Sequence, residues 1–208
     1  MLYTETIDKK TLELLKSLQS KDYLNDFLLV GGTALALYVG HRKSIDLDLF
    51  SIHDFNVADL LEQIHQDYNY QIYHSAKNTL KGRINQINVD FLAHRYPLID
   101  KSILTENYRL ISEKDIVAMK LNALATSGQR SKDFVDIYFL LEKHDLTNML
   151  DYYAYKYKQS NKTQMLKSLI YFDDVDLSDW PVIIKEPGLK WLDVKKRIEK
   201  KVLELIAI

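Results

Sequence analysis

The chain of 208 residues contains no cysteine and only six glycines and three prolines. The absence of cysteine excludes disulfide bonds, thiolate zinc sites and cysteine nucleophiles. No apolar run approaches the roughly 20 residues that a membrane-spanning helix requires, so we expect no membrane partner. A net charge of −1 gives no global field that attracts nucleic acid, and a site for a polyanion must be a local patch. The N-terminus lacks a signal-peptide layout, which favours a cytoplasmic protein.

Glycine is scarce, because average usage of about 7% would give about 15 residues in a chain of this length. Two of the six glycines, Gly31 and Gly32, are nevertheless adjacent. They follow the apolar run 26–30 and precede the helix-forming segment 33–39, which predicts the order strand, turn, helix. Glycine lets a backbone approach a phosphate closely, and the amides at a helix start point toward it. A plain tight turn could use the same residues.

The apolar periodicity predicts an α+β fold. We expect a small mixed β-sheet core with flanking helices in residues 1–110, followed by an all-helical region in residues 111–208 that completes the active-site cleft. The expected strands are 26–30, 44–50, 70–75, 79–84 and 86–93. The expected helices are 8–24, 33–39, 56–68, 112–125, 132–144, 147–157, 162–171 and 189–206.

The segment 44–50 alternates strictly between apolar and polar residues. This period of two predicts a half-buried strand with Ile45, Leu47 and Leu49 on one face and two aspartates on the other. The carboxylates of Asp46 and Asp48 would then project from one face, about 6.6 Å apart along the strand. Taken alone, such a pair is also compatible with solvated surface acids.

A third acid, Asp90, lies in the predicted strand 86–93 with the same alternation. Three carboxylates on neighbouring strands would repel one another unless a divalent cation neutralised them. Magnesium prefers a few carboxylates together with water and phosphate oxygens. Asp46, Asp48 and Asp90 are therefore candidate ligands of Mg²⁺ or Mn²⁺.

The helical half contains two lysines of interest. Lys120 lies four residues after Ile116 and four before Leu124, on the apolar side of its helix, where an ammonium must reach water along its stem or meet an anion. Lys132 precedes Asp136 by four residues, and an exposed i,i+4 ion pair is the structural alternative to a functional role.

A lysine- and tyrosine-rich stretch follows. It combines residue types that contact phosphates and stack on bases, although half-buried tyrosines and solvated lysines on a helix would show the same pattern. Its members are Tyr152, Tyr153, Tyr155, Lys156, Tyr157, Lys158, Lys162 and Lys167.

The string GGTALALYVGHRKSIDLDLF, followed later by VDFL, closely resembles the AbiEii/AbiGii toxin family of polymerase-beta-like nucleotidyltransferases. The helical pair DIVAMKLNALATSGQRSKDFVDIYFLL, with its KDxxD motif, resembles the same family. Together these matches cover roughly residues 28–141.

The resemblance implies roles for individual residues. Nucleotide phosphates would be held by Gly31, Gly32 and Thr33, with Arg42 and Ser44 steadying the loop or the phosphates. Metal ions would be bound by Asp46, Asp48 and Asp90. Phosphate charge would be neutralised by Lys120 and Lys132, while Asp133 and Asp136 complete KDxxD, where an acid could act as a base.

The resemblance also implies a metal-dependent transfer of NMP from an NTP to an acceptor hydroxyl. The protein would be the toxin of a bacterial type IV toxin–antitoxin (abortive infection) system. Its partners would be a cognate antitoxin and an RNA acceptor, which in some members of the family is the 3′ end of tRNA. Two alternatives stay open: the same chemistry on a small molecule or protein, or a non-catalytic nucleotide-binding module. Three clustered acids disfavour the module, which has no need of them.

Overall fold

The computed structural model describes residues 2–105, 107–159 and 161–207. Its centre is a mixed sheet with the strand order β3-β4-β5-β2-β1-β7-β6. The pairs β2–β5 and β1–β7 are parallel and the other neighbours are antiparallel. The strands are β1 (Leu28–Val30), β2 (Leu47–Ser51), β3 (Tyr70–Ala76), β4 (Thr79–Ile84), β5 (Ile87–Ala93), β6 (Ile103–Leu104) and β7 (Arg109–Leu110).

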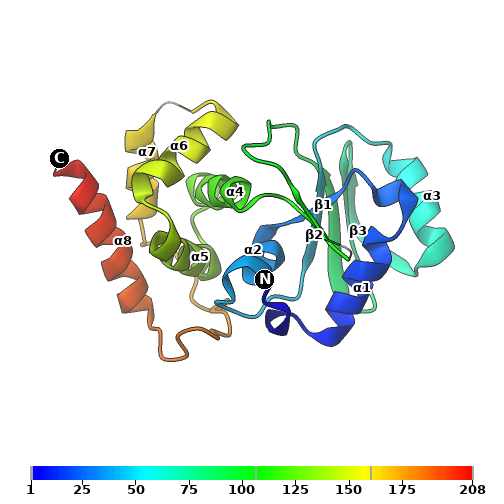
Figure 1. Ribbon diagram of the computed structural model, residues 1–208, viewed down its shortest axis with the longest axis horizontal. Helices are drawn as coiled ribbons and strands as arrows, with labels where there is room; N and C mark the ends of the chain where they lie inside the picture. The colour runs from blue at the N-terminus through cyan, green and yellow to red at the C-terminus, as the bar shows by residue number, and fades with distance from the viewer. Residues whose placement is uncertain (1, 106, 160, 208) are drawn as a thin grey trace.

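Helices cover both faces of this sheet. Figure 1 shows α1 and α3 on one side, and α2 with the later helices on the other. The helices are α1 (Lys9–Gln19), α2 (Gly31–Val39), α3 (Val57–Asp67), α4 (Glu113–Thr126), α5 (Ser131–Lys143), α6 (Leu146–Tyr157), α7 (Lys162–Leu169) and α8 (Trp191–Ile206), with short 3₁₀ helices at Thr4–Thr6 and Asp22–Leu24. None of the described helices is long and apolar enough to cross a membrane.

The α+β class is confirmed. All strands named above precede residue 111, and the later segments of regular structure are helices.

The split into two domains near residue 110 stays a prediction. Helix α2 is buried on nearly every side, with Ala34, Leu35, Ala36 and Leu37 fully enclosed. It packs against β1 and β2 on one side and α4 and α5 on the other, so it joins the two halves.

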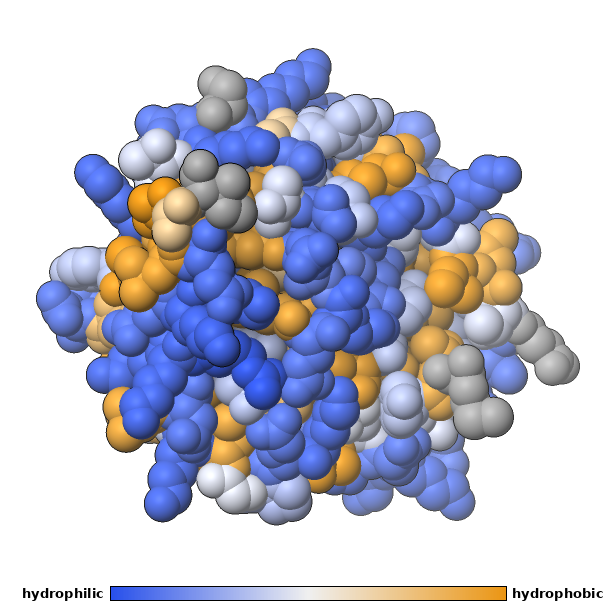
Figure 2. Space-filling model, turned by 60° about the vertical axis from the view of Figure 1, so that its left-hand side comes forward, coloured by the Kyte–Doolittle hydropathy of each residue, from blue (hydrophilic) through white to orange (hydrophobic). Residues whose placement is uncertain are grey.

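The face presented by the helical half is mainly hydrophilic, with separate small apolar patches (Figure 2).

Strand β2 is shorter than the alternation predicts. It begins at Leu47, and the expected core residue Ile45 is instead 61% exposed. One cause is the short antiparallel neighbour β1, although the parallel neighbour β5 extends to Ile87, two residues beyond the partner of Leu47. Val30, the last residue of β1, pairs with Asp48, and the chain then turns into α2 at Gly31. No part of β1 is left to pair with residues 44–46, so Asp46 lies just before the strand rather than within it.

Helix boundaries also differ from those predicted. The first helix ends at Gln19, and α2 begins at Gly31 itself. Strands β6 and β7 were not foreseen, because two residues are too few to show a period. Ser112 caps α4, since its hydroxyl accepts from the amide of Asp115. The helix α5 begins at Ser131, one residue earlier than predicted, and the hydroxyl of Ser131 donates to Asp179 over 2.6 Å.

Candidate active site

A cleft of about 720 Å³ lies between the β2–β5 part of the sheet and the helices α2, α4 and α5. Eleven of the twelve residues singled out from the sequence line it, namely Gly31, Gly32, Thr33, Arg42, Ser44, Asp46, Asp48, Asp90, Lys120, Lys132 and Asp133. The twelfth, Asp136, is fully buried behind the cleft wall. Segments more than 100 residues apart in sequence therefore meet in one place.

The glycine pair forms the start of α2 at the floor of the cleft. Gly31 has φ = 69°, a left-handed conformation that favours glycine, and a side chain there would collide with the carboxylate of Asp48. A side chain at Gly32 would meet the guanidinium of Arg42. No side chain caps the first turn of α2. The first turn of α2 therefore lines the cleft without a capping side chain and beside two charged groups, an arrangement that suits an anionic phosphate.

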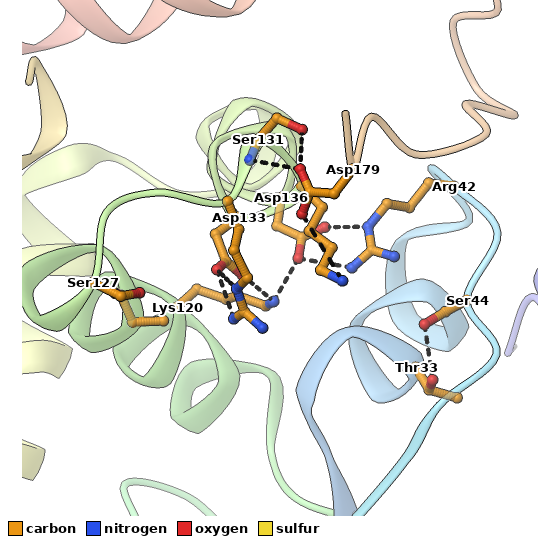
Figure 3. A network of polar contacts seen from close by, with 12 residues as sticks. Thr33, Arg42, Ser44, Lys120, Ser127, Ser131, Asp133, Asp136 and Asp179 are labelled. Atoms are coloured by element: carbon orange, nitrogen blue, oxygen red, sulfur yellow. Dashed lines mark hydrogen bonds and ion pairs between the residues drawn. The ribbon is translucent and has the colours of Figure 1, made fainter. Parts of the chain in front are cut away.

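Thr33 ties this helix to the loop that carries Asp46. Its hydroxyl donates to the backbone carbonyl of Asp46 and lies 2.8 Å from the hydroxyl of Ser44 (Figure 3). Thr33 is almost fully buried. In this structure both hydroxyls hold the loop in place, so the aspartate is positioned by the same turn that would receive phosphate.

Two of the three predicted acids lie side by side. Asp48 in β2 is in direct register with Asp90 in the parallel strand β5. Burial and the like charge of Asp90 raise the pKa of Asp48 to about 6. Asp46 adds a smaller effect in the same direction, and its own carboxylate accepts a 3.0 Å hydrogen bond from the side chain of Asn88. The cleft thus carries an excess of negative potential at Asp48.

The third acid already has partners. Asp90 accepts a 2.8 Å hydrogen bond from the hydroxyl of Tyr73, and the ammonium of Lys81 lies 3.0 Å from its other oxygen. In the described part of the chain, no three His, Cys, Asp or Glu side chains form a ready-made metal group. The donor set nonetheless fits a hard divalent cation, because it offers carboxylates crowded enough to disfavour ionisation of Asp48.

A buried charge network forms the opposite wall (Figure 3). Asp136 accepts from Nε of Arg42 at 2.6 Å and from Nε2 of His41 at 2.7 Å, and the ammonium of Lys120 lies 2.6 Å from its second oxygen. Burial alone would raise the pKa of Asp136, but Arg42 and Lys120 hold it well below the usual range. Burial also lowers the pKa of His41, which keeps that imidazole neutral.

Lys120 bridges two acids. It lies 2.8 Å from Asp133 as well as 2.6 Å from Asp136, and its side chain reaches the cleft although the residue is only 7% exposed. The other oxygen of Asp133 accepts from Arg130 at 2.8 Å. Of the two alternatives for a lysine on the apolar face, access to water or an anionic partner, the structure shows the anionic partner.

The exposed i,i+4 pair considered for Lys132 and Asp136 is wrong. Asp136 is fully buried and bound to other cations, whereas the ammonium of Lys132 lies 4.0 Å from Asp179. Helix α5 turns these two residues to different surroundings. Lys132 is the more available cation at the cleft, and its role toward phosphate stays a prediction.

Some cleft residues were not found from the sequence, namely Tyr73, Lys81, Asn88, Arg130 and Asp179. A signal existed for Lys81. Asn85 and Gln86 both have positive φ and form a two-residue turn that pairs Ile84 with Ile87. That register places Lys81 opposite Asp90.

The tyrosine- and lysine-rich stretch is mainly a packing element. Lys156 is fully buried, with its ammonium 2.6 Å from Asp115, so it is not available to RNA. Tyr157 is also buried, and its hydroxyl lies 3.1 Å from Nε2 of His94 at the edge of the cleft. The packing interpretation is correct for Tyr157, whereas the solvated position that it gave Lys156 is wrong.

A glycine turn at a helix start, acids on adjacent strands and a cationic helical wall define a nucleotidyltransferase. The family model described as "Nucleotidyl transferase AbiEii toxin, Type IV TA system" matches residues 13–99 and 66–203. The chain belongs to this family.

The chain is also similar to individual proteins. An uncharacterized protein of Aquifex aeolicus (strain VF5) is 32% identical over 206 residues, which are 96% of this chain and 98% of the relative. MenT4, a nucleotidyltransferase toxin of Mycobacterium tuberculosis, superposes with a TM-score of 0.61 at 15% identity, covering 95% of this chain and 85% of its own. A putative nucleotidyltransferase from Helicobacter pylori gives 0.55 at 15% identity, covering 95% of each chain. At such identities the two structures support the fold alone.

Proposed function

We propose that the protein is a metal-dependent toxin that transfers NMP from an NTP to a hydroxyl at the 3′ end of an RNA, with tRNA as the favoured acceptor. The observation that carries the chemistry is the in-register pair of Asp48 and Asp90, which faces Lys120 across the cleft beside the glycine turn. Family membership supports the toxin role and a cognate antitoxin. The RNA acceptor rests on the family resemblance.

The residues of this chain would bind and orient the triphosphate. The backbone N–H groups of Gly32 and Thr33 at the start of α2 would donate hydrogen bonds to its oxygens, and Lys120 and Lys132 would offset its charge from the helical wall. Nucleotidyl transfer demands mainly positioning and charge neutralisation. Arg42 is committed to Asp136 and would act by holding the loop.

Asp46, Asp48 and Asp90 would hold Mg²⁺ or Mn²⁺, which when bound lowers the pKa of an acceptor hydroxyl and stabilises the leaving pyrophosphate. Lys81 now balances the charge of Asp90. We expect the metal and Lys81 to compete for that carboxylate.

The test is transfer from each of the four labelled NTPs in the presence of Mg²⁺ to total RNA, purified tRNA or total protein. Asp48→Asn keeps the size of the side chain and should abolish transfer. Asp59→Asn, on α3 away from the cleft, is the matched control and should retain it. Label in tRNA is the expected result. Label in protein or a small molecule alone would favour the other acceptors, and unchanged transfer by Asp48→Asn with a normal melting curve would refute the site.

A further inference from the structure

The side chain of Tyr73 enters the same cleft from the edge strand β3. Its hydroxyl donates a 2.8 Å hydrogen bond to Asp90, and the residue lines the cleft together with Asp48 and the glycine turn. No other described residue places a hydroxyl on one of the three candidate carboxylates. The residue is also 58% exposed, so packing into the core does not explain its position.

A local irregularity of the sheet directs this side chain. The pairing of β3 with β4 shifts between Ile72, which faces Gly82, and His74, which faces Lys81. Tyr73 is therefore the extra residue of a β-bulge. Bulges bend a strand and re-aim a side chain, and they are frequent next to active sites.

The hydrogen bond between Tyr73 and Asp90 resembles the one that an acceptor hydroxyl would make with a catalytic base. An acceptor hydroxyl must approach the α-phosphate while a base within hydrogen-bond reach takes its proton. The hydroxyl of Tyr73 already has such a base in Asp90, and Asp90 is the register partner of Asp48. The ring is not enclosed, so it can move toward a bound nucleotide.

We propose that Tyr73 is an internal acceptor and that the enzyme nucleotidylylates itself there when no RNA occupies the cleft. This inference rests on the proposed function, because it uses the same NTP site. The phenolic oxygen of Tyr73 forms a bond to the α-phosphorus as the bond from that phosphorus to the bridging oxygen breaks. Pyrophosphate leaves, and the hydroxyl proton passes to the carboxylate of Asp90. The product is a tyrosine–NMP phosphodiester whose bulk lies in the cleft.

The experiment incubates the full-length protein with Mg²⁺ and each of the four NTPs in the absence of RNA. Intact-mass spectrometry should show a gain of one nucleotidyl group, and tandem mass spectrometry should place it on Tyr73. Tyr73→Phe removes only the hydroxyl and should lose the gain. Tyr96→Phe is the matched control, since Tyr96 is also exposed but lies outside the cleft. A melting curve for each variant shows that it has folded.

The possible outcomes distinguish self-modification at Tyr73 from the proposed function. A mass gain on Tyr73 that Asp48→Asn abolishes supports self-modification. A gain that maps elsewhere, or that persists in Tyr73→Phe, overturns it. Transfer to RNA with no gain on the protein overturns it as well and leaves the proposed function standing. Absence of both reactions with all four NTPs rejects the proposed function and the inference together.

Discussion

Two buried lysines offer a comparison that tests how the charge network works. Lys120 and Lys156 each lie within 3 Å of an acid in the helical half, with distances of 2.6 Å from Lys120 to Asp136 and 2.6 Å from Lys156 to Asp115. Methionine matches the length and apolar stem of lysine and removes the charge. We expect Lys120→Met and Lys156→Met to have different effects on stability, because the acids that they leave behind differ.

Removal of Lys120 leaves no acid without a cation. Asp136 keeps both hydrogen bonds from Arg42, at 2.6 and 3.0 Å, and Asp133 keeps Arg130 at 2.8 Å. The network changes from three cations and two anions to two of each, with His41 neutral. Exchange of a buried ionic group for an apolar one of similar volume is often neutral or stabilising when no charge is left unpaired. We therefore expect the free energy of unfolding to stay within about 1 kcal/mol of wild type.

Removal of Lys156 leaves Asp115 fully buried without a cation. The carboxylate keeps only neutral donors, which are the hydroxyl of Ser112 and the amides of Ile99 and Asp100. Removal of one partner of a buried ion pair lowers the free energy of unfolding by about 3–5 kcal/mol. With a urea m-value of about 2 kcal/mol per molar, that cost lowers the unfolding midpoint by about 2 M.

The assays are urea unfolding followed by circular dichroism, and NTP binding by calorimetry at two ionic strengths. Lys120→Met should unfold near the wild-type midpoint and bind NTP at least about tenfold more weakly, since a lost charge-assisted hydrogen bond is worth about 1.5–3 kcal/mol. Lys156→Met should show the reverse: a urea midpoint below that of wild type and near-normal NTP binding while the protein is folded. Equal losses of stability in the two variants would refute the charge accounting. Unchanged NTP binding by Lys120→Met at both ionic strengths would make Lys120 a purely structural residue.

Three further substitutions follow from the site. Asp48→Asn should stabilise the metal-free protein at pH 7 by up to about 3 kcal/mol, because a pKa raised from 3.8 to about 6 makes ionisation unfavourable in the fold at about 1.4 kcal/mol per unit. The cost of ionising Asp48 in the folded protein grows as the pH rises from 4 to 6. Urea unfolding of Asp48→Asn in a chelator should therefore show no gain in stability near pH 3. Gly31→Ala should lose at least about 1–2 kcal/mol and most NMP transfer, because Gly31 has positive φ and a Cβ there meets Asp48; wild-type activity would contradict the close contact. Asp136→Asn should lower the urea midpoint markedly, since Arg42 and Lys120 would then share only Asp133 as a neighbouring anion; a midpoint equal to wild type would contradict it.

The local pattern indicated which acids and glycines line the sheet side of the cleft. Asp48 and Asp90 lie on strands whose alternation is visible in sequence, and the glycine pair is conspicuous in a chain with six glycines. Their register could not be predicted, since it depends on which strands become neighbours. The parallel pairing of β2 with β5 brings the acids together although 41 residues lie between them.

The helical wall was less predictable. The apolar surroundings of Lys120 indicated access to water or an anionic partner, and the spacing of Lys132 and Asp136 was compatible with an exposed ion pair. That interpretation failed because Asp136 lies on the face of α5 that is covered by the loop carrying Arg42. A long-range contact of this kind leaves no periodic trace. The sequence gives no signal for the bulge that directs Tyr73 either, because an inserted residue in an exposed edge strand changes no apolar pattern.

The two walls of the cleft carry opposite charges, and this arrangement bears on how the halves of the chain depend on each other. The sheet supplies carboxylates that a divalent cation can bridge, and the helices supply ammonium groups for phosphate oxygens, so an NTP with its metal would complement both walls at once. Arg42 belongs to the first half by sequence, but its guanidinium is buried against Asp136 in the second. A fragment ending at residue 110 would lose both the counter-ion of Arg42 and the residues of the second half that cover it, so the loop between α2 and β2 would lose the contacts that hold it in place. The cation that completes the site thus also makes the sheet half depend on the helical half for its stability.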